Sequence, residues 1–126
     1  MSLLEELVGC TLNEVSFSRF SYRLRFDGRR GDVPCFFDLL ASGDLALDPA
    51  GKVGMQALST ALHPLIEQTV ETAQLNGEGL LLRFAGFDGH RAEVVLLAGQ
   101  GSPDSAFEVR VIEANSGDLK DWQQVS

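Results

Sequence analysis

Several residue types are scarce in this chain, and each shortage excludes a class of protein. The two cysteines, Cys10 and Cys35, are too few for a disulfide framework and lack the spacing of a metal site. No apolar run approaches the roughly 20 residues that a membrane-spanning helix requires. The first residues include Glu5 and Glu6 but no basic residue, so we expect no signal peptide. We therefore expect a cytoplasmic protein with reduced cysteines and no membrane partner.

Positive charge is also scarce. Ten Lys and Arg residues face 18 Asp and Glu residues, which gives a formal charge of −8. Binding to nucleic acid requires a basic surface, so nucleic acid is excluded as a partner. The same negative charge would steer a basic protein partner toward the chain.

Motifs that carry chemistry are missing as well. The two histidines, His63 and His90, lie in different halves of the chain and have no ligand pair beside them. No Gly-x-Ser-x-Gly elbow is present, and the Gly-x-Gly fragments at 77–79 and 99–101 lack the third glycine of a phosphate-binding loop. We expect no cofactor and no metal, and an enzyme is the less favoured interpretation.

What the chain does contain is the apolar alternation typical of strands. The clearest case is the segment from Ser21 to Phe26, in which Tyr22 and Leu24 alternate with arginines. A closing segment at 119–125 carries the only tryptophan, Trp122. Strands are predicted at 11–18, with a bulge between Leu12 and Val15, and at 21–26, 33–40, 45–48, 69–75, 80–84, 91–98 and 106–113.

Helical spacing occurs in two places. A short helix is predicted from about Leu3 to Val8, after a Ser2 cap. A longer helix is predicted over about 53–67, where leucines recur at steps of three and four residues. Pro64 lies inside it and either kinks the helix or begins a second short turn after Leu62.

The chain also repeats itself at an offset of 58 residues. Residues 65–86 align without a gap on residues 7–28, and six of the 22 pairs are identical, including Thr11/Thr69 and Phe26/Phe84. At 126 residues the chain is one domain, 1–126. We predict an α+β fold, mainly an antiparallel sheet built from two pseudo-repeated helix–β-hairpin units at about 2–48 and 53–113, with the longer helix between them.

One candidate site is a group of arginines. Arg23 and Arg25 share the solvent face of their strand, and Arg83 repeats Arg25 in the second copy. They are a candidate anion-binding site. The alternative is an exposed sheet face on which arginines pair with Glu14 or Glu71 of a neighbouring strand.

A second candidate site lies in the acidic C-terminal third of the chain. An apolar or aromatic anchor rimmed by acids is the usual form of a protein-binding hot spot. The alternative is that Trp122 packs on the edge of the core and the acids are merely solvated. The candidate partner-binding residues are Glu108, Arg110, Glu113, Asp118, Asp121 and Trp122.

The order of these motifs resembles a family of small bacterial proteins of unknown function. The motifs are Leu7-Val8-Gly9, Leu24-Arg25-Phe26-Asp27-Gly28, Leu65 to Val70, Leu82-Arg83-Phe84, Phe107-Glu108-Val109-Arg110-Val111, and Gly117-Asp118-Leu119 ahead of Trp122. The chain departs from the family at Arg110, where the pattern has a tryptophan. The resemblance implies a compact binding protein, in one form a toxin-neutralising immunity protein.

Three functions remain open. The first is a non-catalytic cytoplasmic binding protein, such as an immunity-type inhibitor that presents an acidic surface to a basic toxin. The second is a domain that binds a small anionic ligand, or an enzyme, using the arginine-bearing face. The third is a homo-oligomeric module in which exposed strand edges of two copies pair. A binding site is expected where the two copies differ, as at Arg23, Arg29 and Arg30 in the first copy and Phe87 and Asp88 in the second.

Overall fold

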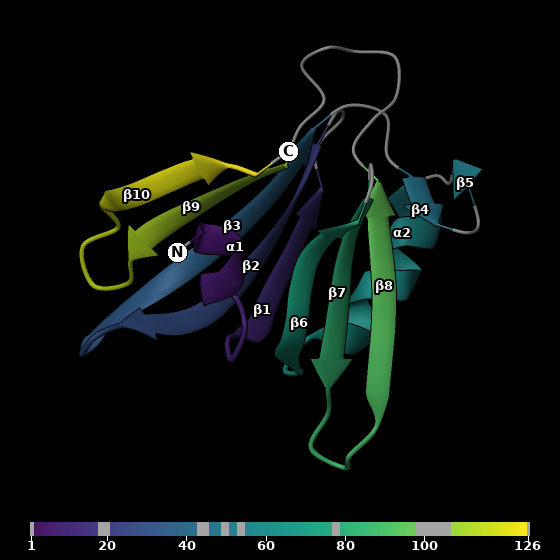
Figure 1. The fold of residues 1–126 in the computed structure, drawn as a ribbon, viewed down its shortest axis with the longest axis horizontal. Coiled ribbons are helices and arrows are strands. Elements are labelled where there is room, and N and C mark those ends of the chain that lie inside the picture. The colour runs from purple at the N-terminus through teal and green to yellow at the C-terminus, as the bar shows by residue number, and fades with distance from the viewer. Residues whose placement is uncertain are drawn as a thin grey trace.

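The structure is a computed structural model that describes residues 2–17, 21–42, 46–48, 51–52, 55–76, 79–97 and 107–125. Within these residues ten strands form one sheet in the order β10-β9-β3-β2-β1-β6-β7-β8-β4-β5 (Figure 1). Every pairing is antiparallel. The strands are β1 (Thr11–Phe17), β2 (Ser21–Arg30), β3 (Val33–Ser42), β4 (Ala46–Asp48), β5 (Gly51–Lys52), β6 (Thr69–Asn76), β7 (Gly79–Ala85), β8 (Arg91–Leu97), β9 (Phe107–Glu113) and β10 (Leu119–Gln124).

The helices are short, so the predicted α+β fold of two helix–hairpin units with a long helix over 53–67 is wrong. α1 (Leu3–Glu6) has four residues, α2 (Met55–Leu62) has eight, and η1 (His63–Leu65) is a single 3-10 turn. Pro64 lies at the start of η1 and has no N–H for an α-helical bond, which ends α2 at Leu62. Upstream of the helix, Gly51–Lys52 form β5, which was not predicted.

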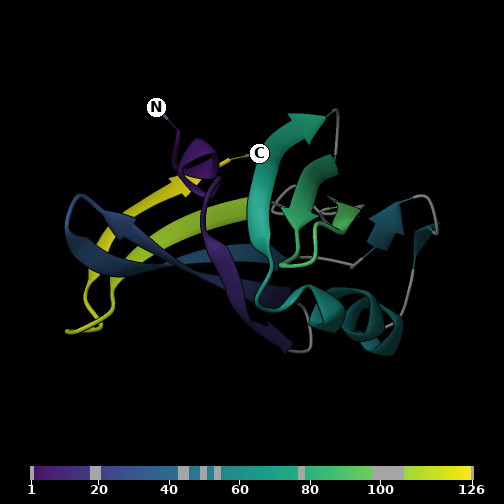
Figure 2. The same ribbon diagram turned by 90° about the horizontal axis from the view of Figure 1, so that it is seen from below.

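The core lies on one face of the curled sheet. α1 contacts β6 and β9, and α2 lies beside the end of β1, as seen from below in Figure 2. The rings of Phe26 and Phe84 stack in the core with their centroids 6.5 Å apart. The largest fully buried side chains come from both halves of the chain: Tyr22, Phe26, Phe37, Phe84, Phe107, Leu7, Leu12, Leu24, Leu39, Leu62 and Leu80.

The two halves of the sheet meet where β1 pairs with β6. The register joins Thr11 to Thr69, residues that are 58 positions apart, and their hydroxyl oxygens lie 3.4 Å from each other. Each hydrogen bond of this seam has a counterpart at the same offset, so a local two-fold axis passes between the two threonines. The four bonds are Gly9 N–H to Val70 O at 2.8 Å with Glu67 N–H to Leu12 O at 2.7 Å, and Leu12 N–H to Gln68 O with Val70 N–H to Cys10 O, both at 2.9 Å.

Irregular backbone follows the same offset. The β1–β2 register shifts between Leu12 and Glu14, which confirms the predicted bulge, and the β6–β7 register shifts between Val70 and Thr72. Positive φ occurs at Gly9 (94°) and at its counterpart Glu67 (75°). Glycine adopts this conformation without steric cost, whereas glutamate does not.

Candidate functional site

Arg25 of the predicted anion site is fully engaged by a carboxylate. Its Nε and Nη2 donate to the two oxygens of Asp38, both at 2.8 Å, and its guanidinium lies 4.7 Å from the centre of the Phe36 ring. Asp38 is 3% exposed, and it is the one buried charged residue in the described part of the chain. The hydrogen bond to Asp38 raises the pKa of Arg25, against the opposing effect of burial.

The other two predicted arginines are paired in the same way. Arg23 Nη2 lies 2.8 Å from Glu14 Oε1, as the alternative interpretation expected, and Arg83 Nη2 lies 2.7 Å from Glu93 Oε2. Hydrogen bonds from Ser16 and then Arg23 lower the pKa of Glu14. Two strands, β1 and β6, separate Arg83 on β7 from the arginines of β2, so the structure does not gather the three into one site.

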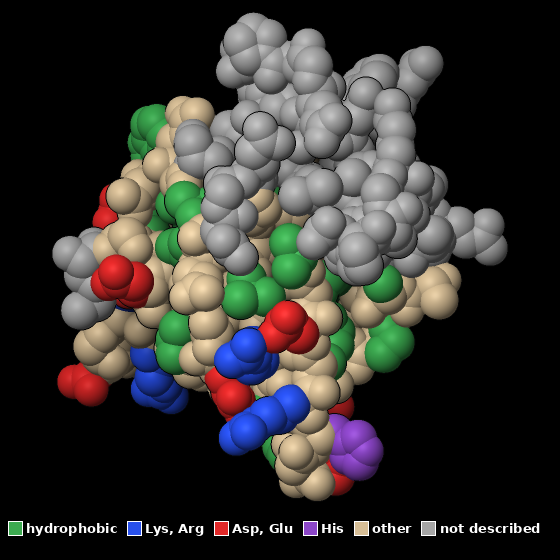
Figure 3. All heavy atoms as spheres, turned by 45° about the vertical axis from the view of Figure 1, so that its right-hand side comes forward, with side chains coloured by type: hydrophobic (Ala, Val, Ile, Leu, Met, Phe, Trp, Pro, Cys, Tyr) green, Lys and Arg blue, Asp and Glu red, His purple; other side chains and the backbone are tan. Residues whose placement is uncertain are grey.

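This pairing leaves the described surface with an excess of free acids. Arg29 is the one described cationic side chain without a carboxylate partner. Arg83 pairs with Glu93 and Arg91 with Glu71. Figure 3 shows acidic and basic side chains side by side on the face that it presents. Five of the acids whose side chains the structure describes have no cationic partner: Glu5, Asp27, Asp32, Glu67 and Asp118.

The predicted partner-binding residues divide between two faces of the sheet. Val109 and Val111 are buried in the core, so Glu108 and Arg110 point to the opposite side. Trp122 pairs with Arg110 and therefore lies on that side too. We call this side of β2, β3, β9 and β10 the outer face, and its residues are Arg25, Asp27, Phe36, Asp38, Leu40, Glu108, Arg110, Ile112, Leu119 and Trp122.

The remaining predicted residues lie elsewhere. Asp121 pairs with Val111 in register and binds Arg30 at 3.1 Å on the core side of β10. Glu113 binds Lys120 at 3.3 Å. Asp118 is exposed in the turn before β10 and has no cationic partner among the described residues.

Across the outer face runs a row of apolar side chains with an acid at its β2 end. The registers place Asp27 opposite Phe36, Phe36 opposite Ile112, and Ile112 opposite Leu119. Asp27 has no cationic partner and accepts a hydrogen bond from Asn13 Nδ2 at 3.0 Å, and the exposed Asp118 lies in the turn just before Leu119. Leu119 is 55% exposed and Trp122, in the next row, 57%. Exposed apolar residues gathered in this way mark interaction surfaces.

The free edge of β10 is protected against pairing with a strand of another molecule. Trp122 N–H donates to Asp121 Oδ1 at 2.8 Å, and a register shift lies between Leu119 and Asp121. Proteins use charged residues and bulges of this kind to prevent edge-to-edge pairing. The outer face is therefore better suited to binding than this edge.

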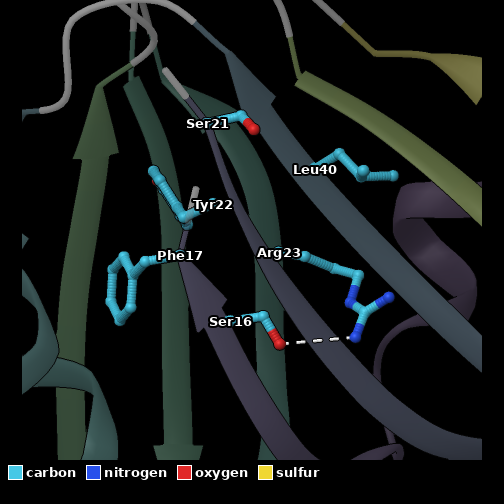
Figure 4. Close-up of a pocket in the computed structure, with 6 residues that line it drawn as sticks. All are labelled: Ser16, Phe17, Ser21, Tyr22, Arg23 and Leu40. Atoms are coloured by element: carbon cyan, nitrogen blue, oxygen red, sulfur yellow. Dashed lines mark hydrogen bonds between the residues drawn. The ribbon is translucent and has the colours of Figure 1, made fainter. Parts of the chain in front are cut away.

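Two cavities lie at opposite ends of the hairpins. The first, of about 270 Å³, is lined by Ser16, Phe17, Ser21, Tyr22, Arg23 and Leu40. In Figure 4 Phe17 and Tyr22 lie to one side of the strands and Arg23 and Leu40 to the other. The Tyr22 hydroxyl and Arg23 Nε are buried without a hydrogen-bond partner, and burial raises the pKa of Tyr22. This cavity is the nearest to the predicted anion site.

The second cavity, of about 330 Å³, is lined by Ile66, Glu67, Gln68, Gly86, Phe87 and Asp88. Phe87 and Asp88 belong to the positions at which the two copies differ. Glu67 and Gln68 were not predicted as site residues. The alignment of Glu67 with Gly9 was the available signal, because a glutamate stands where the first copy has a glycine.

The described residues contain no group of three His, Cys, Asp or Glu side chains placed to hold a metal ion. Burial, with smaller effects of Glu6 and Asp27, raises the pKa of Cys10 to about 11, so this thiol is protonated at neutral pH. Over the same ranges no helix is both long enough and apolar enough to cross a membrane.

No protein-family model matches the chain, and no match was found among curated proteins or solved structures. We therefore infer function from the geometry of the described residues.

Proposed function

We propose that the protein is a non-catalytic cytoplasmic binding protein that captures a basic protein partner on its outer face, in the manner of an immunity-type inhibitor. The observation that supports this most directly is the apolar row of Phe36, Ile112 and Leu119, with Asp27 at its β2 end and Asp118 in the turn before Leu119, neither of which has a cationic partner. Apolar side chains in the centre and charges at the rim are the usual arrangement of a protein interface.

The chemistry of the partner follows from the charges that are left unpaired. Arg23, Arg25 and Arg110 of this region are neutralised by carboxylates of the same chain. A partner that supplies acids would have to break these pairs, whereas a partner that supplies lysine or arginine meets free acids. The formal charge of −8 would speed the encounter with a basic partner.

The single tryptophan allows a direct binding test. The probe is the purified product of the gene next to this one in its native genome, added while the emission of Trp122 is followed. Burial of Trp122 would shift its emission to shorter wavelength. Calorimetry then compares Trp122→Ala and Leu119→Ala with a matched control, Leu75→Ala, which removes a 44% exposed leucine from β6.

We expect each outer-face variant to weaken binding by tenfold or more, since hot-spot truncations cost about 2 kcal/mol or more. The Leu75 control should bind like the unmodified protein. Binding that survives both outer-face substitutions, or a neighbouring protein that is acidic and does not bind, would count against the proposal.

A further inference from the structure

The cavity of about 330 Å³ lies away from the outer face, between the η1–β6 connection and the β7–β8 turn. Its position corresponds by the 58-residue offset to the contact between Cys10 and Gly28 in the first half. There Cys10 Sγ fills the space over Gly28, at 2.5 Å from where a Cβ would stand. In the second half Gly86 has Gln68 Cδ at 3.7 Å and Asp88 Oδ1 at 3.2 Å from that position. A side chain at residue 86 would therefore crowd the cavity.

Glu67 occupies a backbone conformation that favours glycine. Its φ is 75°, and its N–H is held by Leu12 O at 2.7 Å, so the seam of the sheet imposes the conformation. The counterpart Gly9 adopts the same conformation without a side chain. A glutamate is sterically disfavoured in this conformation relative to glycine. The strain places an unpaired carboxylate on the wall of the cavity, and strained residues of this kind are often functional.

Gln68 adds a hydrogen-bond acceptor without a donor. Its Nε2 donates to Pro64 O at 3.2 Å, and its Oε1 is buried with no partner. A buried acceptor that loses its hydrogen bond to water destabilises the free protein.

The remaining wall combines an aromatic ring with a second carboxylate. Phe87 is 95% exposed, the most exposed of the large apolar residues described. Asp88 Oδ1 accepts a hydrogen bond from His90 N–H at 3.0 Å, and Oδ2 lies 2.9 Å from His90 Nδ1. The hydrogen bond to His90 N–H lowers the pKa of Asp88, which keeps the carboxylate charged.

We propose that this cavity binds the guanidinium group of an arginine side chain presented by a protein or peptide. Its lining offers the carboxylates of Glu67 and Asp88, which accept hydrogen bonds, beside the Phe87 ring, whose face attracts cations. The planar guanidinium has five donors and can address several acceptors while stacking on the ring, which a lysine ammonium cannot do as well. This inference does not rest on the proposed function, because it uses a different surface.

The test is a ¹H–¹⁵N NMR titration with N-acetyl-arginine N-methylamide. The neutral isostere N-acetyl-citrulline N-methylamide and the corresponding lysine derivative are the ligand controls. We expect saturable chemical-shift changes at the amides of Glu67, Gln68 and Phe87. The affinity should be highest for the arginine derivative and about fivefold or more lower for the citrulline derivative. Equal shifts with arginine and citrulline, or no saturable shift at these amides, would overturn the proposal.

Variants separate recognition from general charge. Glu67→Gln should weaken arginine binding several-fold at unchanged stability, and Phe87→Ala should weaken it as well. Glu67→Gly should weaken binding while it raises the melting temperature, a combination that a purely structural role would not produce. Asp32→Asn, which removes an exposed acid without a cationic partner in another part of the described chain, and Leu75→Ala should leave binding unchanged. If Asp32→Asn weakens binding as much as Glu67→Gln, the attraction is only the net charge of the protein and the site is refuted.

Discussion

At the scale of single residues, the ion pair with Arg25 allows the Asp38 carboxylate to be buried on the outer face. Asp38 is buried on both sides by neighbouring strands, and the bidentate guanidinium satisfies both of its oxygens. A buried ion pair of this kind adds little net stability, but the removal of one partner leaves the other charge buried and unpaired.

We therefore predict that Arg25→Met destabilises the fold by about 3–5 kcal/mol, because Asp38 is left uncompensated. The double variant Arg25→Met/Asp38→Leu should recover most of that loss, since no buried charge remains. Urea denaturation of the two variants and the parent measures the coupling. Equal destabilisation by the single and double variants would show that packing, and not charge, dominates at this position.

A second residue-scale prediction concerns alkaline pH. Burial raises the pKa of Cys10 from 9.0 to about 11, so between these values the unfolded chain loses the proton and the folded chain keeps it. The contribution of the Cys10 thiol to the free energy of unfolding is complete below pH 9. That contribution, at most about 3 kcal/mol, is lost as the pH rises toward 11. The raised pKa of Tyr22 acts in the same direction at higher pH.

Denaturation at several pH values between 8 and 11 checks this expectation. Cys10→Ser should lose less stability over that window than the parent, because the serine hydroxyl does not ionise there. Parallel pH curves for the two proteins would contradict the role of Cys10.

At the scale of elements, the edge of β10 is protected by one carboxylate. Asp121 binds both the N–H of Trp122 and the guanidinium of Arg30. We predict that Asp121→Ala frees the N–H and promotes pairing between copies, so the protein should form dimers or larger species as its concentration rises. Light scattering after size exclusion measures this. Asp118→Asn, which also removes one negative charge next to β10, should stay in the oligomeric state of the parent.

Strands β1 to β4 and β6 to β9, the short helix α1 and the turn after Leu62 were predictable from the sequence, whereas β5, β10 and the length of α2 were not. A period of two is a local property, so the alternation of Tyr22, Leu24 and Phe26 was sufficient for β2. The leucines over 55–65 keep helical spacing even though Pro64 divides them between α2 and η1, because Leu62 and Leu65 are both buried. The spacing of the leucines therefore predicted correctly that Leu62 and Leu65 are buried, but it overestimated the length of the helix.

The sites were less predictable, since they depend on which strands become neighbours. Arg23 could be paired with Glu14 from a hairpin alone, and that pair is present. The place of Asp38 opposite Arg110 requires β3 to pair with β9, and no local pattern indicates this. The cavity lined by Glu67 could not be predicted for the same reason, because it forms between the start of β6 and the turn after β7.

At the scale of the whole molecule, the seam between β1 and β6 has the fewest register pairs of any two neighbouring strands in the described sheet. It has one register pair, whereas β2 and β3 pair over ten. We predict that the amides of Leu12 and Val70, which are equivalent across the local two-fold axis, exchange with deuterium at similar rates and faster than those in the centre of β2. Native-state exchange followed by NMR measures the rates. Slower exchange at the seam than in β2 would contradict this ranking.

The order β10-β9-β3 also has a consequence for how the chain folds as it is made. β3 ends at Ser42, and its second neighbour begins at Phe107, after β4 to β8 have all been synthesised. While the ribosome translates the intervening residues, β3 has β2 as its only neighbour, and the backbone groups along its other edge are open to other chains. The nascent protein therefore passes through a period in which a chaperone, or the rapid arrival of β9, decides between folding and aggregation.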